Sequence, residues 1–338
     1  LSSLVQEVVN RPGWAPNNDL GFTITGTGRR VAESYNGSQS GAPLLHVKYS
    51  TDTEPPPPPP PVGTVTFAVI GDFGQVRAST ATVASTVAQL DPDFVVTVGD
   101  NNYTSSSDLD NVIGRYYSAY IGDYQGSFGP GSPTNRFFPS LGNHDYSDGG
   151  GLPAYEAYFT LPGTGVVTSG TSGNERYYDF TMGPVQFFVV NSNSQEPDGN
   201  NSTSDQADWL QAGLAASTAP WQIVLFHHAP YSSGEHHGSD TTMQWPFAAW
   251  GADAVLAGHE HIYERLAVDG IPYFINGVGG ADLHAASPPI PESRFVYDDD
   301  FGTMLVEVCE GRLAFTFHSI SEGVVDALAV GAASCAVG

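Results

Sequence analysis

Cationic side chains are scarce in this sequence of 338 residues. It holds 11 Lys and Arg residues against 36 Asp and Glu residues, Lys48 is its only lysine, and its formal net charge is −25. A strongly anionic protein has no broad electrostatic attraction to nucleic-acid backbones or anionic lipid headgroups. The composition therefore excludes nucleic-acid binding through a basic surface.

Long apolar runs and cysteines are also rare. The longest runs, such as Phe187 to Val190, are far shorter than the roughly 20 residues that a membrane-spanning helix needs, so no membrane span is expected. The two cysteines, Cys309 and Cys335, are either a disulfide of an oxidising compartment or two buried thiols. The scarcity of lysine, the abundance of acid and a sequence that begins at Leu1 without Met favour a secreted or periplasmic location.

A proline run divides the sequence. Seven consecutive prolines, Pro55 to Pro61, form a stiff extended spacer within a linker over residues 51–63. Residues 1–50 contain short strand patterns but bury little surface alone, so they are expected to be the tail of a β-sandwich module or strands docked on the main domain. Attachment to a surface or polymer through this small all-β segment is one expectation. Residues 64–338 form the main domain.

Strand and helix patterns alternate in the main domain. Apolar strands at 65–70 and 93–98 flank a helical pattern at 78–90, which predicts a βαβ unit. An α/β fold of the α+β type is therefore expected, with mixed sheets flanked by helices. The further predicted elements are a helix over 205–216 capped by Ser204, a strand over 221–226, a helix near 241–250, a strand over 252–256 and a hairpin of 304–308 with 312–318.

Polar residues of a few types follow the predicted strands. Because ligands gather at the carboxyl ends of strands in open α/β sheets, these residues are expected at one edge. Singly, each has an ordinary explanation as a turn, a cap or a hydrogen-bonded core residue. Together, carboxylates, an amide oxygen, imidazoles and a phenol suit two metal ions, and thiolates are missing. In His259-Glu260-His261, alternate residues of an extended segment would share one face.

Five sequence blocks in this order resemble the purple acid phosphatase branch of the calcineurin-like metallophosphoesterases. The resemblance extends over roughly residues 64–320 and implies a metallophosphoesterase β-sandwich of mixed sheets flanked by helices. The blocks are Gly71-Asp72-Phe73-Gly74, Gly99-Asp100-Asn101-Asn102-Tyr103, Gly142-Asn143-His144-Asp145, Val224-Leu225-Phe226-His227 and Gly258-His259-Glu260-His261.

The resemblance implies a dinuclear centre. It assigns Asp72, Asp100, Tyr103 and His261 to one metal, usually Fe(III). It assigns Asp100, Asn143, His227 and His259 to a divalent ion such as Zn(II), Mn(II) or Fe(II). Asp100 would bridge two cations about 3.5–4 Å apart. Many relatives have a histidine where this sequence has Gly74, so Tyr103 is expected to supply the missing ligand.

Three further histidines have implied roles at the substrate. In the resembling family, His144, His236 and His237 contact phosphate, and a histidine there can protonate the leaving alkoxide. The alternative for His236 and His237 is a solvated loop pair. His228, next to the expected ligand His227, is expected to be structural or to lie just outside the ligand set.

The implied activity is that of a secreted hydrolase of small phosphorylated substrates. The first prediction is a phosphatase that cleaves monoesters by attack of a metal-bound hydroxide at an Fe(III)–M(II) centre. A phosphodiesterase or nucleotide pyrophosphatase with the same centre is an alternative. A third, of another class, is a surface-attached binding protein whose metal site is inactive or redox-active.

Overall fold

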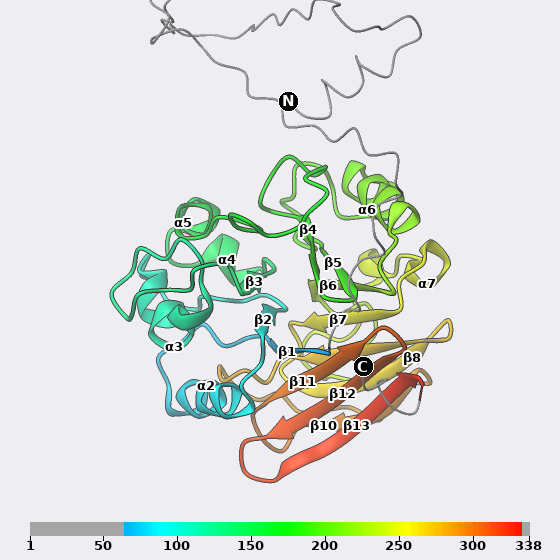
Figure 1. Ribbon diagram of the computed structural model, residues 1–338. Coiled ribbons are helices and arrows are strands. Elements are labelled where there is room, and N and C mark those ends of the chain that lie inside the picture. The colour runs from blue at the N-terminus through cyan, green and yellow to red at the C-terminus, as the bar shows by residue number, and fades with distance from the viewer. Residues whose placement is uncertain (1–63, 333–338) are drawn as a thin grey trace, which may run out of the picture. The chain divides into compact units, whose positions relative to one another are not determined.

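The computed structural model describes residues 64–332 (Figure 1). The segment 1–50, the linker 51–63 and Cys335 lie outside the described residues, so what the sequence indicates for them stays a prediction. Cys309 is buried and disulfide-bonded, which excludes the free-thiol alternative for this residue. Within the described part of the chain, no helix has both the length and the apolar character needed to cross a membrane.

A six-stranded mixed sheet contains the predicted βαβ unit. β1 (Val65–Ile70) and β2 (Phe94–Thr97) are parallel and joined by α2 (Ala78–Leu90), as expected. The predicted hairpin is β11 (Gly302–Cys309) with β12 (Arg312–Ser319), and β11 pairs antiparallel with β1. The order is β13-β12-β11-β1-β2-β3, with β13 (Gly323–Gly331) and β3 (Phe137–Pro139) at the edges.

The second sheet has seven strands in the order β10-β8-β9-β7-β6-β5-β4. Its centre is parallel, and β6 runs between its two parallel neighbours β5 and β7. Because these strands run in one direction, their carboxyl ends lie at one edge of the sheet. The bounds are β4 (Tyr178–Met182), β5 (Val185–Val189), β6 (Trp221–His228), β7 (Ala254–Gly258), β8 (Tyr263–Val268), β9 (Ile271–Asn276) and β10 (Ser293–Tyr297).

Of the three expected helices, those over 78–90 and 205–216 are confirmed and the third is wrong. α6 (Asp205–Ala216) begins after Ser204, whose hydroxyl accepts a hydrogen bond from the Ala207 N–H at 3.2 Å. The single helix expected near 241–250 is wrong, because Pro246 separates two short helices and proline disfavours a helical residue before it. The short helical segments are η1 (Asp110–Gly114), α3 (Arg115–Tyr117), η2 (Ser118–Tyr120), α4 (His144–Ser147), α5 (Gly151–Tyr158), η3 (Thr241–Met243) and α7 (Phe247–Trp250).

The two sheets pack face to face through buried aromatic rings. Phe67 and Phe94 of the six-stranded sheet contact Phe187 of the other sheet, with ring centroids 5.1 and 5.5 Å apart. All three rings are fully buried. On the outer face of the seven-stranded sheet, Leu210 of α6 and Phe247 of α7 form a second core, and both helices lie beside that sheet in Figure 1. The predicted sandwich of mixed sheets flanked by helices is confirmed.

Candidate metal centre

Two buried carboxylates lie just beyond β1 and β2. Asp72 and Asp100 have φ angles of 55° and 53°, a left-handed conformation that residues with a side chain rarely adopt. Backbone N–H groups bind both: His259 donates to Oδ2 of Asp72 at 3.0 Å, and His144 donates to Oδ1 of Asp100 at 2.9 Å. A Cβ atom at Gly142 would lie 2.1 Å from Oδ1 of Asp100, so the third block needs glycine there.

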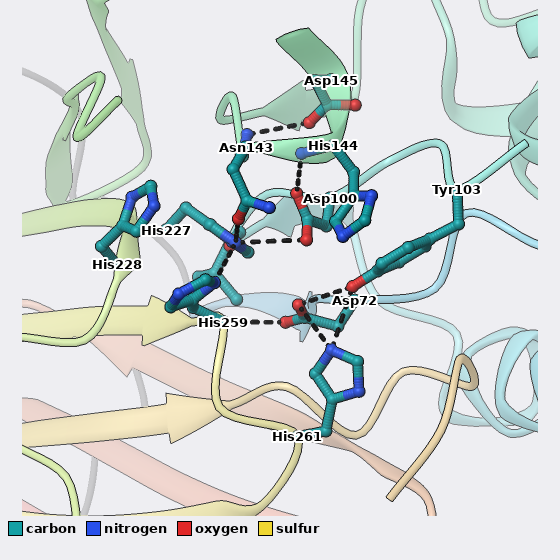
Figure 2. A network of polar contacts seen from close by, with 12 residues as sticks. Asp72, Asp100, Tyr103, Asn143, His144, Asp145, His227, His228, His259 and His261 are labelled. Carbon is teal, nitrogen blue, oxygen red and sulfur yellow. Dashed lines mark hydrogen bonds and ion pairs between the residues drawn. The ribbon is translucent and has the colours of Figure 1, made fainter. Parts of the chain in front are cut away.

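Asp72, Tyr103 and His261 converge at one end of the site (Figure 2). The Tyr103 hydroxyl lies 2.9 Å from Oδ1 of Asp72 and 3.0 Å from Nε2 of His261, and Nε2 of His261 lies 3.3 Å from the same Asp72 oxygen. At Gly74 a Cβ atom would lie 2.2 Å from the backbone nitrogen of Asn102, so no histidine fits there. The expectation that Tyr103 supplies the ligand missing at Gly74 is in keeping with the position of its phenol beside Asp72 and His261.

Asp100, Asn143, His227 and His259 converge at the other end. Nε2 of His227 lies 3.3 Å from Oδ2 of Asp100, 3.1 Å from Oδ1 of Asn143 and 3.1 Å from Nδ1 of His259. Nδ1 of His227 lies 2.8 Å from the Val98 carbonyl oxygen. That carbonyl needs a donor, so Nδ1 carries a ring proton and Nε2 is the nitrogen that faces the other ligands.

Only one of the two adjacent histidines in β6 joins this set. β6 extends two residues beyond the predicted end and includes both His227 and His228. His227 contacts Asp100 and Asn143, whereas the His228 ring packs beside His259, with ring centroids 4.5 Å apart. Nδ1 of His228 lies 2.7 Å from the Ser192 hydroxyl. Burial and the neighbouring His227 lower the pKa of His228 to about 3.

The expectation that His259 and His261 share one face of an extended segment is wrong. His259 has a φ angle of 71°, which breaks the alternation of an extended chain. As a result His259 joins His227, whereas His261 joins Tyr103. Both histidines still reach the expected groups of ligands, by a sharper turn of the backbone.

The seven donors fit two hard or borderline cations. Ligand atoms around one ion, at bond lengths of about 2.0–2.2 Å, lie roughly 3 Å from one another. The interatomic distances given above, 2.9 to 3.3 Å, have that spacing. Asp72, Tyr103 and His261 would hold one ion and Asn143, His227 and His259 the other, with Asp100 between them.

The electrostatics of the site favour positive charge. Burial raises the pKa of Asp100, but the facing His227 imidazole outweighs burial and brings it to about 2. Burial lowers the pKa of His227, but Asp100 and Asp72 raise it to about 9. Burial and the Asp72 carboxylate raise the pKa of the Tyr103 phenol well above its ordinary value. Among residues 64–332, the ion-pair partners of Asp100 and Asp72 are His227 and His261 rather than a Lys or Arg, so no permanently charged side chain neutralises the two carboxylates.

His144, His236 and His237 lie around the ligands without joining them. The His144 ring stacks on Tyr103 at 4.3 Å, and its Nδ1 lies 2.7 Å from Oδ2 of Asp148. The His237 ring stacks on His259 at 3.8 Å, and His236 stacks on His237 at 4.4 Å. His236 and His237 are exposed, so their nitrogens are accessible to a substrate at the edge of the site.

Sequence reasoning missed Glu260 and His284. The Glu260 side chain is fully buried and accepts hydrogen bonds from the backbone N–H groups of His236, His237 and Gly238 at 3.2, 2.6 and 3.0 Å. Nδ1 of His284 lies 3.1 Å from Oε1 of Glu260, and its ring stacks on His261 at 4.0 Å. A strand pattern at 271–276 could have indicated His284. This strand is β9, which is parallel to β7, so the segment that follows it leads to the same edge of the sheet.

Glu260 is a positioning residue for the histidine loop, and we expect Glu260→Gln to misplace His236 and His237. Glutamine keeps the size but turns an NH₂ group towards backbone donors, and a buried unpaired donor costs about 1–3 kcal/mol. For the phosphatase activity that the five blocks imply, hydrolysis of an alkyl phosphate should fall about 10–100-fold, the effect common for residues that orient others.

The measurement that isolates positioning compares an alkyl phosphate with an aryl phosphate at full metal content. Misplaced acid groups lower alkyl phosphate hydrolysis more, whereas general destabilisation lowers both equally. The exposed Glu307→Gln variant is the control and should behave as the unaltered protein. An equal loss on both esters would show that Glu260 has only a structural role.

Comparisons with known proteins agree with this geometry. A family model described as Calcineurin-like phosphoesterase matches residues 65–263, which include all five blocks. Purple acid phosphatase 22 of Arabidopsis thaliana is 28% identical over 271 residues, covering 74% of this chain and 59% of that protein. Purple acid phosphatase 3 of the same plant is 28% identical over 286 residues, covering 76% and 75%. The chain thus spans less than two thirds of the first relative.

A solved structure matches the fold. Purple acid phosphatase PPD1 from yellow lupin (Lupinus luteus) seeds superposes with a TM-score of 0.64 at 18% sequence identity, covering 80% of this chain and 54% of that one. At this identity the likeness concerns the fold alone. The family match and the two plant relatives confirm the resemblance to purple acid phosphatases.

Proposed function

The chain belongs to the calcineurin-like phosphoesterase family, and from this premise we propose that it is a metal-dependent phosphatase that hydrolyses phosphate monoesters. The observation that carries the proposal is the convergence of seven donors from distant strand ends at distances of 2.9 to 3.3 Å. Two cations held there would lower the pKa of a bound water and neutralise charge on the phosphate oxygens. The surrounding histidines would bind and orient the ester.

We propose Fe(III) for the ion at Asp72, Tyr103 and His261, and Zn(II), Mn(II) or Fe(II) for the other. A phenolate is a hard, anionic donor, which favours a trivalent ion. The other group pairs an amide oxygen with two imidazoles, which suits a borderline divalent ion. Asp100 supplies a carboxylate to both, since it contacts His227 on one side and raises the pKa of Tyr103 on the other.

We also infer that the protein acts outside the cytoplasm. A disulfide at Cys309 is typical of an oxidising compartment, and the single lysine and net charge of −25 are in keeping with it. Because the anionic surface repels phosphorylated substrates at long range, attraction to the ester would be confined to the metal ions and the histidines.

The test is the colour and metal content of the protein as isolated. We expect two metal ions per chain, including iron, and a visible absorption band from a Tyr103 phenolate bound to Fe(III). Tyr103→Phe should remove this band and leave the fold intact. Tyr116→Phe, outside the site, is the matched control and should keep the band. One metal ion per chain, or two without a tyrosine-dependent band, would contradict the assignment.

A further inference from the structure

A cavity of about 440 Å³ opens beside Asn143 and His228. Figure 2 shows these two residues at the end of the ligand cluster away from Tyr103. The volume lies within the range of about 300–1,000 Å³ typical of small-molecule sites. Its walls are loop 191–200, which follows β5, and the start of η3. The lining residues are Asn143, Ser147, Ser192, Asn193, Ser194, Gln195, Asn200, His228, Asp240 and Thr242.

The lining is almost wholly uncharged and polar. It consists of side-chain amides and hydroxyls with one imidazole and one carboxylate, and aliphatic side chains, Phe, Tyr, Trp, Lys and Arg do not contribute to it. Without an extended aromatic or aliphatic wall, the cavity does not suit a nucleobase or an aryl group. Without a cation and with Asp240 present, it does not suit a second phosphate.

Several polar atoms of the lining have no partner among the described residues. Asn193 is only 5% exposed; its Oδ1 accepts from the Gln195 N–H at 2.9 Å, but its Nδ2 donates to no group of residues 64–332. Nδ2 of Asn200 donates to the Ser192 carbonyl at 2.9 Å, and no group of residues 64–332 donates to its Oδ1. Neither atom is a buried atom without a partner, so both are accessible to a ligand and can form hydrogen bonds with its hydroxyls.

The loop that carries these groups is held in place. The Glu196 carboxylate is buried and forms a salt bridge with Arg176 at 2.9 Å. Gln206 binds both backbone groups of Asn191, accepting from its N–H at 2.7 Å and donating to its carbonyl at 3.0 Å. A loop fixed in this way loses little entropy when a ligand binds.

We propose that this cavity binds the leaving alcohol of a sugar or polyol phosphate. The proposal rests on the proposed phosphatase function and names its substrate class. With the phosphate at the ligand cluster, hydroxyls of the alcohol would accept from Asn193 Nδ2 and donate to Asn200 Oδ1 or Asp240. The site would prefer monophosphates of neutral, hydroxyl-rich alcohols over alkyl phosphates, nucleotides and pyrophosphate.

The test compares kcat/KM for glucose 6-phosphate and hexyl phosphate with the metal-loaded protein. Both esters release a primary alcohol of six carbons, so the difference between them reports hydroxyl recognition. We expect a preference of at least about tenfold for glucose 6-phosphate, since one hydrogen bond contributes roughly that factor. Asn193→Leu and Thr242→Val should each reduce this ratio several-fold. Thr241→Val, the neighbouring threonine outside the cavity, should leave it unchanged.

The outcomes separate the two proposals. If the protein hydrolyses both esters with equal kcat/KM, or if Asn193→Leu and Thr242→Val keep the wild-type ratio, the cavity does not recognise the alcohol and only this inference is wrong. If the protein binds two metal ions but hydrolyses none of the three substrates, glucose 6-phosphate, hexyl phosphate and an activated aryl phosphate, then the proposed phosphatase function is wrong. The inference about the cavity is then wrong as well.

Discussion

Replacing Asp100 with asparagine should nearly abolish hydrolysis and reduce the occupancy of both metal sites. Asp100 lies between the two groups of ligands, and its carboxylate is the one donor assigned to both ions. An amide carries no charge and binds a cation more weakly. Because a bound cation is worth several kcal/mol in the transition state, kcat/KM should fall by about 10³-fold or more.

Elemental analysis alongside the kinetics checks this result. Asn143→Ala should lower mainly the divalent ion, since its amide oxygen faces only the group that contains His227. Asp208→Asn makes the same chemical change on the exposed face of α6 and is the control that should change neither metal content nor rate. Full occupancy and activity in Asp100→Asn, or equal loss of both ions in Asn143→Ala, would contradict this division of ligands.

Replacing the histidine that protonates the leaving group should slow hydrolysis of an alkyl phosphate by about 10²–10⁴-fold and of p-nitrophenyl phosphate much less. An alkoxide needs a proton in the transition state, whereas nitrophenolate leaves without one. We assign this role to His236 or His237, because the His237 ring stacks on His259, the His236 ring stacks on His237, and both lie outside the ligand set. The measurement is kcat/KM of His236→Ala and His237→Ala on both esters, at confirmed metal content.

His144 gives a contrasting expectation. Its ring stacks on Tyr103 and is held by Asp148, so we assign it to phosphate binding. In His144→Ala, kcat/KM should fall by similar factors for both esters, because both carry the same phosphate group. His318→Gln, in β12, is the control for histidine loss elsewhere. If the loss of kcat/KM in both His236→Ala and His237→Ala is the same for the alkyl and the aryl ester, another residue is the acid.

The sequence alone determined the type of fold and the groups at the site. Buried strands and amphipathic helices have distinct periods, so the βαβ unit at 65–98 and the hairpin at 302–319 could be recognised locally. Strand topology placed polar residues of the right types at one sheet edge, and the resemblance of the five blocks to a known family named the seven donors among them. The prediction of a single helix near 241–250 failed because Pro246 divides the helical pattern into η3 and α7.

Only the tertiary structure decided how these groups meet. The left-handed turn at His259 replaces the expected extended segment and sends His259 and His261 to different groups of ligands. Glu260 and His284 became visible only when loops distant in sequence met at one buried carboxylate. The physical reason for this difference is that the periodicity and spacing of residues in the sequence report on contacts within a single helix or strand. Contacts between elements depend on packing and on the pairing of buried polar groups, which no local pattern records.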